Sequence, residues 1–421
     1  MPPSFRPSPL HAIAAPRSTL PPEEALLLIC ARREIPESLR QEARALTQRV
    51  DWERLVDLAR QHRVGSMVYA SLKRDFPEAI PAQPLARLRE DVLAGTHGNL
   101  RLLRELLQLA RLLGAHGIRY AVFKGLVINQ MVYQDLGIRK CGDIDILVGR
   151  GDFLRAKALL QAEGFSQTLS DKAEVQYLQS GLWHEQRQVS IDLHWGLPPR
   201  ELGIRADRIL MRAADITIGG QSLPAFGPED LLIVLCVNAT KEYWNQLLYP
   251  YCDIHEFLRS HPGLDWPALF RRARELRCAR MVGTALRVMT SLYEAPLPAR
   301  GETGIPVDER AAKELLRQLF ELPPDDSGHA GHSRMLHFFD STDDYFLGLI
   351  DTPLQRLAYR LVHIPLRRHV PEAMGLDLAA PPLGLGWLGP IAKAARIGGA
   401  ILRKAYRRLK RCVAGPSAKV D

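Results

Sequence analysis

Several features that define whole classes of protein are missing from this sequence of 421 residues. It has no run of about 18 uncharged apolar residues, which argues against a membrane-spanning helix. Its six cysteines are scattered, with no Cys-x-x-Cys pair, which argues against a disulfide framework or a zinc site. We therefore expect buried thiols in a reducing cytoplasm. Hydrophobic residues nevertheless make up 46% of the chain, which is enough for a globular core.

Acidic residues are scarce only near the C-terminus. Between Pro353 and Asp421 the chain has 13 Lys and Arg but three Asp and Glu, whereas the rest holds 43 basic and 44 acidic residues. The net charge of +9 therefore belongs to a basic tail and says nothing about the partners of the neutral remainder. Within the tail, residues 391–412 predict a basic amphipathic helix. Such a helix could lie on the inner face of a membrane, bind nucleic-acid phosphates, or remain in solvent.

The spacing of hydrophobic residues changes twice along the chain. After a proline-rich leader (1–20), which we expect to be flexible, helical spacing dominates residues 21–116. Short β-prone segments alternate with helices in residues 117–225, and helical spacing returns in residues 226–350 before the basic tail of residues 351–421. This organisation predicts an α+β protein, in which a small mixed sheet is flanked by helical regions at both ends of the sequence.

Three strands and two helix starts can be predicted in more detail. Short β-prone runs predict strands at residues 118–123, 143–148 and 188–195. Asp51 and Asp152 each precede a helical pattern, where a carboxylate can accept hydrogen bonds from the free N–H groups of the first turn. We therefore expect both residues to cap helices.

Three carboxylates fall in the predicted strands. The letters GDID place Asp143 and Asp145 two residues apart, so both side chains should point to the same face of a strand. Like charges side by side repel each other, and such a pair therefore needs a cation. Asp192 lies in another apolar strand, within the letters IDL. If the two strands are neighbours, three carboxylates converge as in a two-metal phosphoryl-transfer site; otherwise they are solvated residues at a sheet edge.

A second group of residues could bind phosphate. Lys124 and Gly125 lie where a predicted strand passes into a helix, and glycine lets the backbone approach a ligand closely. The start of a helix offers free N–H groups and the positive end of the helix dipole. Lys124 and Arg139 could add positive charge against a triphosphate.

The pattern FKG…YQDLGIRKCGDIDILV…IDLHW resembles the nucleotidyltransferase superfamily of the DNA polymerase β type. It is most similar to a poorly characterised bacterial branch with a KG…R..GDiDLLV signature followed by iDLHW, and the resemblance extends over roughly residues 25–300. The superfamily usually has Gly-Ser at the turn, where this chain has Gly125 followed by Leu126. The spacing from Gly125 to Asp143 is also longer than in the compact superfamily pattern.

The resemblance implies roles for the matching residues. Gly125 matches the turn glycine, and Lys124 and Arg139 accompany it at the nucleotide. Asp143 and Asp145 match the pair that holds two metal ions, and Asp192 matches the third carboxylate, which also helps to activate the acceptor. The implied ions are two Mg²⁺, which Mn²⁺ could replace.

The resemblance also implies a reaction, in which a nucleoside monophosphate passes from an NTP such as ATP to an acceptor hydroxyl and pyrophosphate is released. Beyond the core, Lys241 could reach a phosphate, and Trp244 could either stack on a base or pack in a helix core. His194 should share a face with Asp192, as a substrate contact or as a packed histidine.

Two other functions remain open at this point. The chain could be a catalytically inactive protein that senses a nucleotide in the same pocket. It could also be a membrane-associated accessory protein of a biosynthetic pathway, with the basic tail as its working part. The pattern identifies neither the acceptor nor the preferred base.

Overall fold

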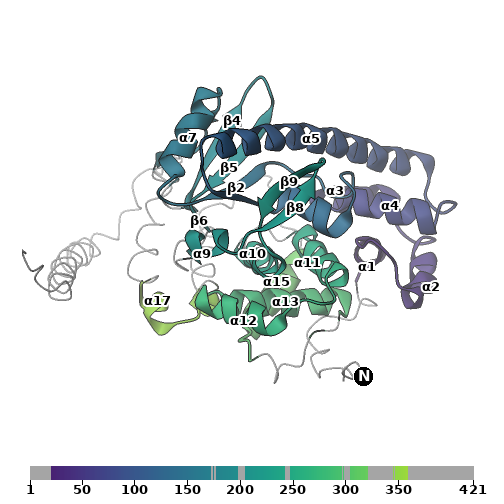
Figure 1. Cartoon of the computed structure of the whole chain (residues 1–421). Coiled ribbons are helices and arrows are strands. Elements are labelled where there is room, and N and C mark those ends of the chain that lie inside the picture. The colour runs from purple at the N-terminus through teal and green to yellow at the C-terminus, as the bar shows by residue number, and fades with distance from the viewer. Residues whose placement is uncertain are drawn as a thin grey trace, which may run out of the picture. The chain divides into compact units, whose positions relative to one another are not determined.

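The structure is a computed structural model, and it describes residues 20–171, 174, 177–197, 204–241, 247–295, 297, 304–320, 345 and 347–358. These residues form a seven-stranded mixed sheet with helices packed around it, as Figure 1 shows, which confirms the predicted α+β fold. The predicted tail helix at residues 391–412 and Trp244 lie outside the described residues.

The chain begins with a bundle of helices. Pro22 starts the first one, in keeping with the preference of proline for the first turn, and the Asp51 side chain caps another by accepting hydrogen bonds from the N–H groups of Glu53 and Arg54. The second helix was not predicted, because only Leu39 and Ala43 on it are buried. The helices are α1 (Pro22–Cys30), α2 (Glu37–Leu46), α3 (Trp52–Gln61), α4 (Gly65–Asp75) and the long α5 (Ala82–Ala115).

The sheet has the strand order β3-β4-β5-β2-β1-β9-β8. The three strands predicted from the sequence lie at its centre. The strand β1 pairs antiparallel with β2, and β2 pairs parallel with β5. Every residue of β1 and β2 is buried, and apart from Asp145 these strands carry no charged residue. The strands are β1 (Tyr120–Phe123), β2 (Ile144–Val148), β3 (Ser166–Gln167), β4 (Gln179–His184), β5 (Val189–His194), β8 (Ala214–Ile218) and β9 (Gln221–Ala225).

The outer strands were not predicted individually. The hairpin of β8 and β9 turns at Gly219 and Gly220, both of which have positive φ angles, as a tight hairpin turn requires. A Gly-Gly pair between two short runs was therefore an available signal in the sequence. The strand β4 lacks a regular alternation, since Ser180, Gly181 and Leu182 are buried in succession. A separate pair is formed by β6 (Gly196–Leu197) and β7 (Ile204–Arg205).

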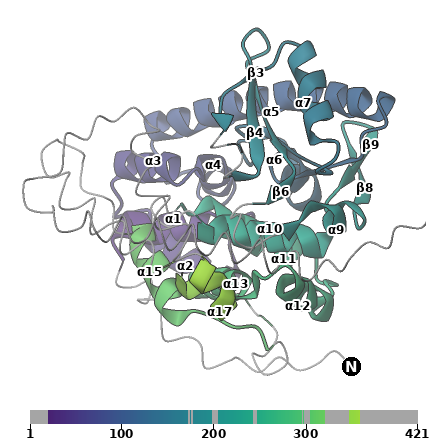
Figure 2. The ribbon, with the colours of Figure 1, turned by 90° about the vertical axis from the view of Figure 1, so that its left-hand side faces the viewer.

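A second group of helices follows the sheet, close to where the sequence predicts it. In both Figure 1 and Figure 2 these helices lie below the sheet. They pack against the N-terminal bundle: the Arg33 N–H donates to Glu256 at 2.9 Å, and the Tyr293 hydroxyl donates to the Ala31 carbonyl at 3.1 Å. The helices are α10 (Pro228–Lys241), α11 (Tyr249–Ser260), α12 (Trp266–Glu275), α13 (Ala279–Tyr293), α15 (Glu309–Phe320) and α17 (Pro353–Ala358).

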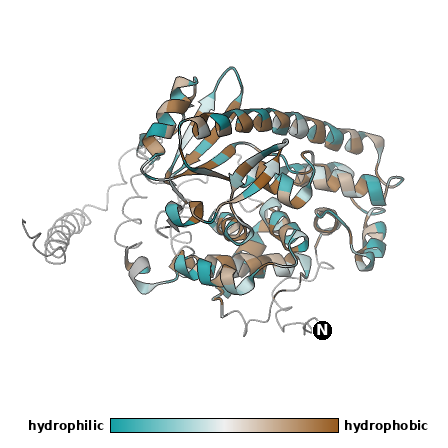
Figure 3. Cartoon of the chain, viewed as in Figure 1, coloured by the Kyte–Doolittle hydropathy of each residue, from teal (hydrophilic) through white to brown (hydrophobic). Residues whose placement is uncertain are grey.

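Most of these helices are amphipathic. Figure 3 shows hydrophobic and hydrophilic residues mixed along α5, α12 and α13, as expected of helices that bury one side. None of the helices in the described part of the chain combines the length and the apolar character needed to cross a bilayer. The thiols of Cys30, Cys141, Cys236, Cys252 and Cys278 are free and buried, as predicted.

The two predicted caps differ, and this difference can be tested. Asp152 occupies the N-cap position of α7 (Phe153–Ala162), but its side chain makes no capping hydrogen bond, so that prediction was wrong. Replacing Asp51 by Ala should lower the free energy of unfolding by about 1 kcal/mol, because two N–H groups of α3 lose their acceptor. The matched variant Asp152→Ala should change it by less than about 0.5 kcal/mol. Urea unfolding of both variants measures the difference, and equal losses would contradict it.

Candidate active site

Two carboxylates meet on neighbouring strands at the centre of the sheet. Asp145 on β2 and Asp192 on β5 are directly paired in the parallel register. Side chains at paired positions of adjacent strands stand on the same face, one strand spacing apart. Asp145 is buried, whereas Asp192 is half-buried and remains accessible. The register therefore creates the neighbouring carboxylates that the sequence could only propose.

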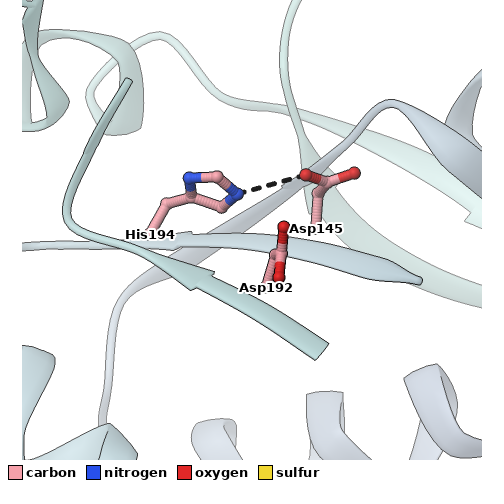
Figure 4. Close-up of side chains that lie close together, drawn as sticks. All are labelled: Asp145, Asp192 and His194. Carbon is pink, nitrogen blue, oxygen red and sulfur yellow. Dashed lines mark hydrogen bonds and ion pairs between the residues drawn. The ribbon is translucent and has the colours of Figure 1, made fainter. Parts of the chain in front are cut away.

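His194 joins these two carboxylates. It lies two residues after Asp192 on β5, hence on the same face, and its Nε2 atom is 3.1 Å from Oδ1 of Asp145, as Figure 4 shows. A potential ligand atom from each of these three residues lies within 4.8 Å of the others. The geometry is that of a cluster that could hold a metal ion.

The protonation of His194 follows from its partner. A carboxylate can only accept a hydrogen bond, so Nε2 carries the hydrogen. Burial lowers the pKa of His194, although the hydrogen bond to Asp145 opposes this effect, and the ring is therefore neutral at pH 7. Nδ1 is buried and has no hydrogen-bond partner among the described residues. His194 thus holds Asp145 in place without adding a positive charge.

Asp143 lies one residue before β2 and is half-buried. Burial raises the pKa of its carboxyl to about 7, and the charges of Asp145 and Asp192 add to this effect, while Lys124 partly opposes it. A raised pKa is what like charges gathered in one place produce when no metal ion neutralises them. The charges of Asp145 and Asp192 therefore both act on Asp143.

Lys124 lies directly against the carboxylates. Its Nζ atom donates to Oδ1 of Asp145 at 2.7 Å, and the ammonium is mostly shielded from solvent. Burial acts to raise the pKa of Asp145, but Lys124 and the His194 hydrogen bond outweigh it and hold that pKa well below its usual range. The pKa of Lys124 is raised by Asp145 in spite of burial, so both groups stay charged. One lysine therefore supplies the positive charge that the buried carboxylate needs.

The backbone at this turn is unusual. Lys124 has φ 53° and ψ −146°, a conformation that costs a residue with a side chain about 1–3 kcal/mol. Gly125 follows with φ 28°, and a Cβ atom there would lie 3.4 Å from the Asp143 carbonyl oxygen. The helix α6 (Gly125–Ile128) starts here and continues as the π-helical turn η3 (Asn129–Tyr133). Gly125, Asp143 and Asp145 line one small pocket, so the helix start lies beside the carboxylates.

Two buried asparagines hold the long segment between Gly125 and Asp143. Asn99 of α5 donates to the carbonyls of Leu136 and Arg139 and accepts from the Cys141 N–H. Asn129 donates to the same Arg139 carbonyl at 2.9 Å. These hydrogen bonds satisfy backbone groups that would otherwise be buried without partners. They give the segment that leads into Asp143 one conformation.

Arg139 is not held by the three carboxylates. Its Nε donates to Asp253 of α11 at 2.7 Å, and the Tyr133 hydroxyl donates to the other oxygen of Asp253 at 2.9 Å. Arg139 still lowers the pKa of Asp143, so it lies within electrostatic range of the site. Lys241 is the last residue of α10 and is half-buried. A role in nucleotide binding stays a prediction for both residues.

Some residues of the site were not predicted. Gln179 donates to Oδ2 of Asp192 at 2.7 Å, because β4 pairs with β5 and places Gln179 opposite His194. No local pattern in the sequence could reveal this pairing. Asn99 could have been noticed, because it is a polar residue at helical spacing from the buried Leu102 and Leu106.

A comparison with protein families identifies the family of this chain. A family model described as an uncharacterised nucleotidyltransferase matches residues 48–294, which is more than half of the chain. No curated protein matches the sequence. Among solved structures, an antigenic nucleotidyltransferase-like protein from Paracoccidioides brasiliensis aligns at 15% identity with a TM-score of 0.32, covering 48% of this chain and 95% of that one. A similarity this low carries no argument about this chain.

The family match spans every residue of the cluster, from Lys124 on the turn to His194 at the end of β5. It also includes the asparagines that hold the segment before β2 and Asp253, the partner of Arg139. The chain belongs to the uncharacterised nucleotidyltransferase family.

Proposed function

We propose that this protein binds an NTP with a divalent metal ion and transfers the nucleoside monophosphate to an acceptor hydroxyl. The observation that carries this proposal is the direct pairing of Asp145 with Asp192 on parallel strands, with Asp143 one residue before β2. Three carboxylates beside one ammonium leave an excess of negative charge in a partly buried site, and a divalent ion would neutralise it.

The donor atoms suit a divalent ion. Carboxylate oxygens of Asp145 and Asp192 are ligands that Mg²⁺ and Mn²⁺ prefer, and His194, which donates its Nε2–H to Asp145, would orient that ligand. Asp143 would add a further oxygen from the edge of the same pocket. When bound, such ions neutralise phosphate charge and stabilise the entering and leaving oxygens. We propose two ions, as the resemblance implies.

The residues have distinct tasks in the proposed reaction. Gly125 and the N–H groups after it would bind the triphosphate, with Lys124 providing charge. The acceptor oxygen forms a bond to the α-phosphorus while the bond from that phosphorus to the bridging oxygen breaks, and pyrophosphate leaves with the electron pair. Asp192, held by Gln179 and accessible to solvent, would receive the proton of the hydroxyl. Positioning and charge neutralisation account for most of such a catalyst.

The first test of the proposed function concerns nucleotide binding. In calorimetric titrations with Mg²⁺, the wild-type protein should bind at least one of ATP, GTP, CTP and UTP. The double variant Asp143→Asn/Asp145→Asn should bind it about 100-fold more weakly or not at all, because the metal-bound triphosphate loses its anchoring carboxylates. This experiment needs no knowledge of the acceptor.

The control for this titration is Asp215→Asn, which removes an exposed carboxylate from β8 and should leave binding unchanged. Unchanged binding by the double variant would show that the nucleotide lies elsewhere. Tight binding without pyrophosphate release, in the presence of candidate acceptors, would instead favour a protein that senses a nucleotide.

A second test of the proposed function concerns the pH dependence of metal binding. The pKa of Asp143 is about 7 without metal, and the ion must displace its proton. The Mg²⁺ affinity should therefore increase as the pH rises through 7, by about tenfold between pH 6 and pH 8 for one coupled proton. Calorimetry in buffers of different ionisation enthalpy measures both the affinity and the proton released. An Asp143→Asn variant that shows the same pH dependence would contradict this assignment.

A further inference from the structure

Lys124 already contacts one of the proposed metal ligands. Its ammonium and the His194 Nε2–H both contact Oδ1 of Asp145, at 2.7 and 3.1 Å. Any ion held between Asp145 and Asp192 would therefore meet a positive charge already in contact with one of its ligands. Two cations this close repel each other strongly where solvent is largely excluded.

The backbone directs Lys124 into this position. A residue with a side chain rarely adopts φ 53° and ψ −146°, yet Lys124 does so one residue before the turn glycine. Phe123, the last residue of β1, is paired with Asp145 of β2. Lys124 follows Phe123, and its strained backbone directs its side chain toward Asp145. Strain is tolerated here because the ammonium satisfies a buried carboxylate.

The contact is also the kind that an ion can break. Lys124 donates to one carboxylate oxygen and lies 5.0 Å from the centre of the Phe123 ring, and its side chain is 17% exposed, whereas Asp145 is 4% exposed. The side chain is long and flexible, and Asp143 and Asp192 act on it as additional negative charges. It can therefore leave Asp145 for another anion without unfolding the strands.

We propose that Lys124 is an exchangeable counter-cation, which neutralises Asp145 in the metal-free protein and is displaced by the entering divalent ion onto the phosphates that arrive with it. The second half of this inference rests on the proposed function, because it requires a polyphosphate at the site. The exchange makes the two ligands cooperative: a metal ion alone takes Asp145 away from the ammonium, whereas a metal ion with a polyphosphate supplies a new anionic partner.

This exchange predicts weak binding of the metal alone. The variant Lys124→Gln keeps a hydrogen-bond donor for Asp145 but removes the charge. In the absence of nucleotide it should bind Mn²⁺ about tenfold more tightly than the wild type, measured from the paramagnetic resonance signal of free Mn²⁺. Inorganic tripolyphosphate should raise the Mn²⁺ affinity of the wild type by a larger factor than that of Lys124→Gln.

Two variants serve as controls. Lys124→Arg keeps the positive charge and should not show the tenfold gain in Mn²⁺ affinity. Lys157→Gln removes another shielded lysine, which forms an ion pair with Glu174 at 2.6 Å. Like Lys124→Gln, this variant loses one ion pair, but the pair lies outside the proposed metal site. It should leave the Mn²⁺ affinity unchanged.

A second measurement uses the wild-type protein and needs no folded variant. Acetic anhydride should label Lys124 slowly in the metal-free protein and faster when Mn²⁺ is saturating, with Lys157 as the internal reference. Peptide mass spectrometry quantifies both labels.

The outcomes separate this inference from the proposed function. Equal or weaker Mn²⁺ binding by Lys124→Gln, or labelling that Mn²⁺ does not accelerate, would make Lys124 a permanent partner of Asp145 and overturn the exchange alone. If neither wild type nor Lys124→Gln bound Mn²⁺, with or without tripolyphosphate, both the exchange and the proposed metal site would be overturned.

Discussion

The structure depends on one constraint, which is that negative charge gathered on the central strands must be neutralised. The parallel register of β2 and β5 puts Asp145 beside Asp192, and Asp143 lies at the start of the same strand. In the metal-free protein Lys124 neutralises part of this negative charge by contacting Asp145. His194 forms a hydrogen bond with the same oxygen atom of Asp145. The strained turn brings Lys124 to this charge, and the neutral His194 orients the carboxylate that Lys124 neutralises.

The helical regions contribute to the site by holding the long segment before β2. Asn99 from α5 and Asn129 from η3 bind its backbone, while Asp253 from α11 binds Arg139. A buried Arg–Asp pair is costly unless both groups are also satisfied by hydrogen bonds, and the Tyr133 hydroxyl completes this pair. The helices on both sides of the core in sequence are therefore part of what positions the carboxylates.

Much of the fold could be predicted because its signals are local. The strands that hold Asp145 and Asp192 have short β-prone runs, so they were predicted with nearly correct ends, and helical spacing predicted the helical regions before and after them. The strand β4 and the role of Gln179 could not be found, since they depend on pairing with β5. Asp152 has the sequence of a helix cap but not the hydrogen bond, because a suitable residue type does not ensure the required backbone geometry.

The sequence by itself determined which residue types are present at which spacing: three aspartates in apolar strands, a Lys-Gly turn, and enough similarity to indicate the family. Tertiary structure decided which of these side chains meet. It brought potential ligand atoms of Asp145, Asp192 and His194 within 4.8 Å of one another. It also paired Lys124 with Asp145 and Arg139 with Asp253. Spacing along a strand follows from covalent geometry, whereas contacts between strands and helices depend on register and packing, which are properties of the whole fold.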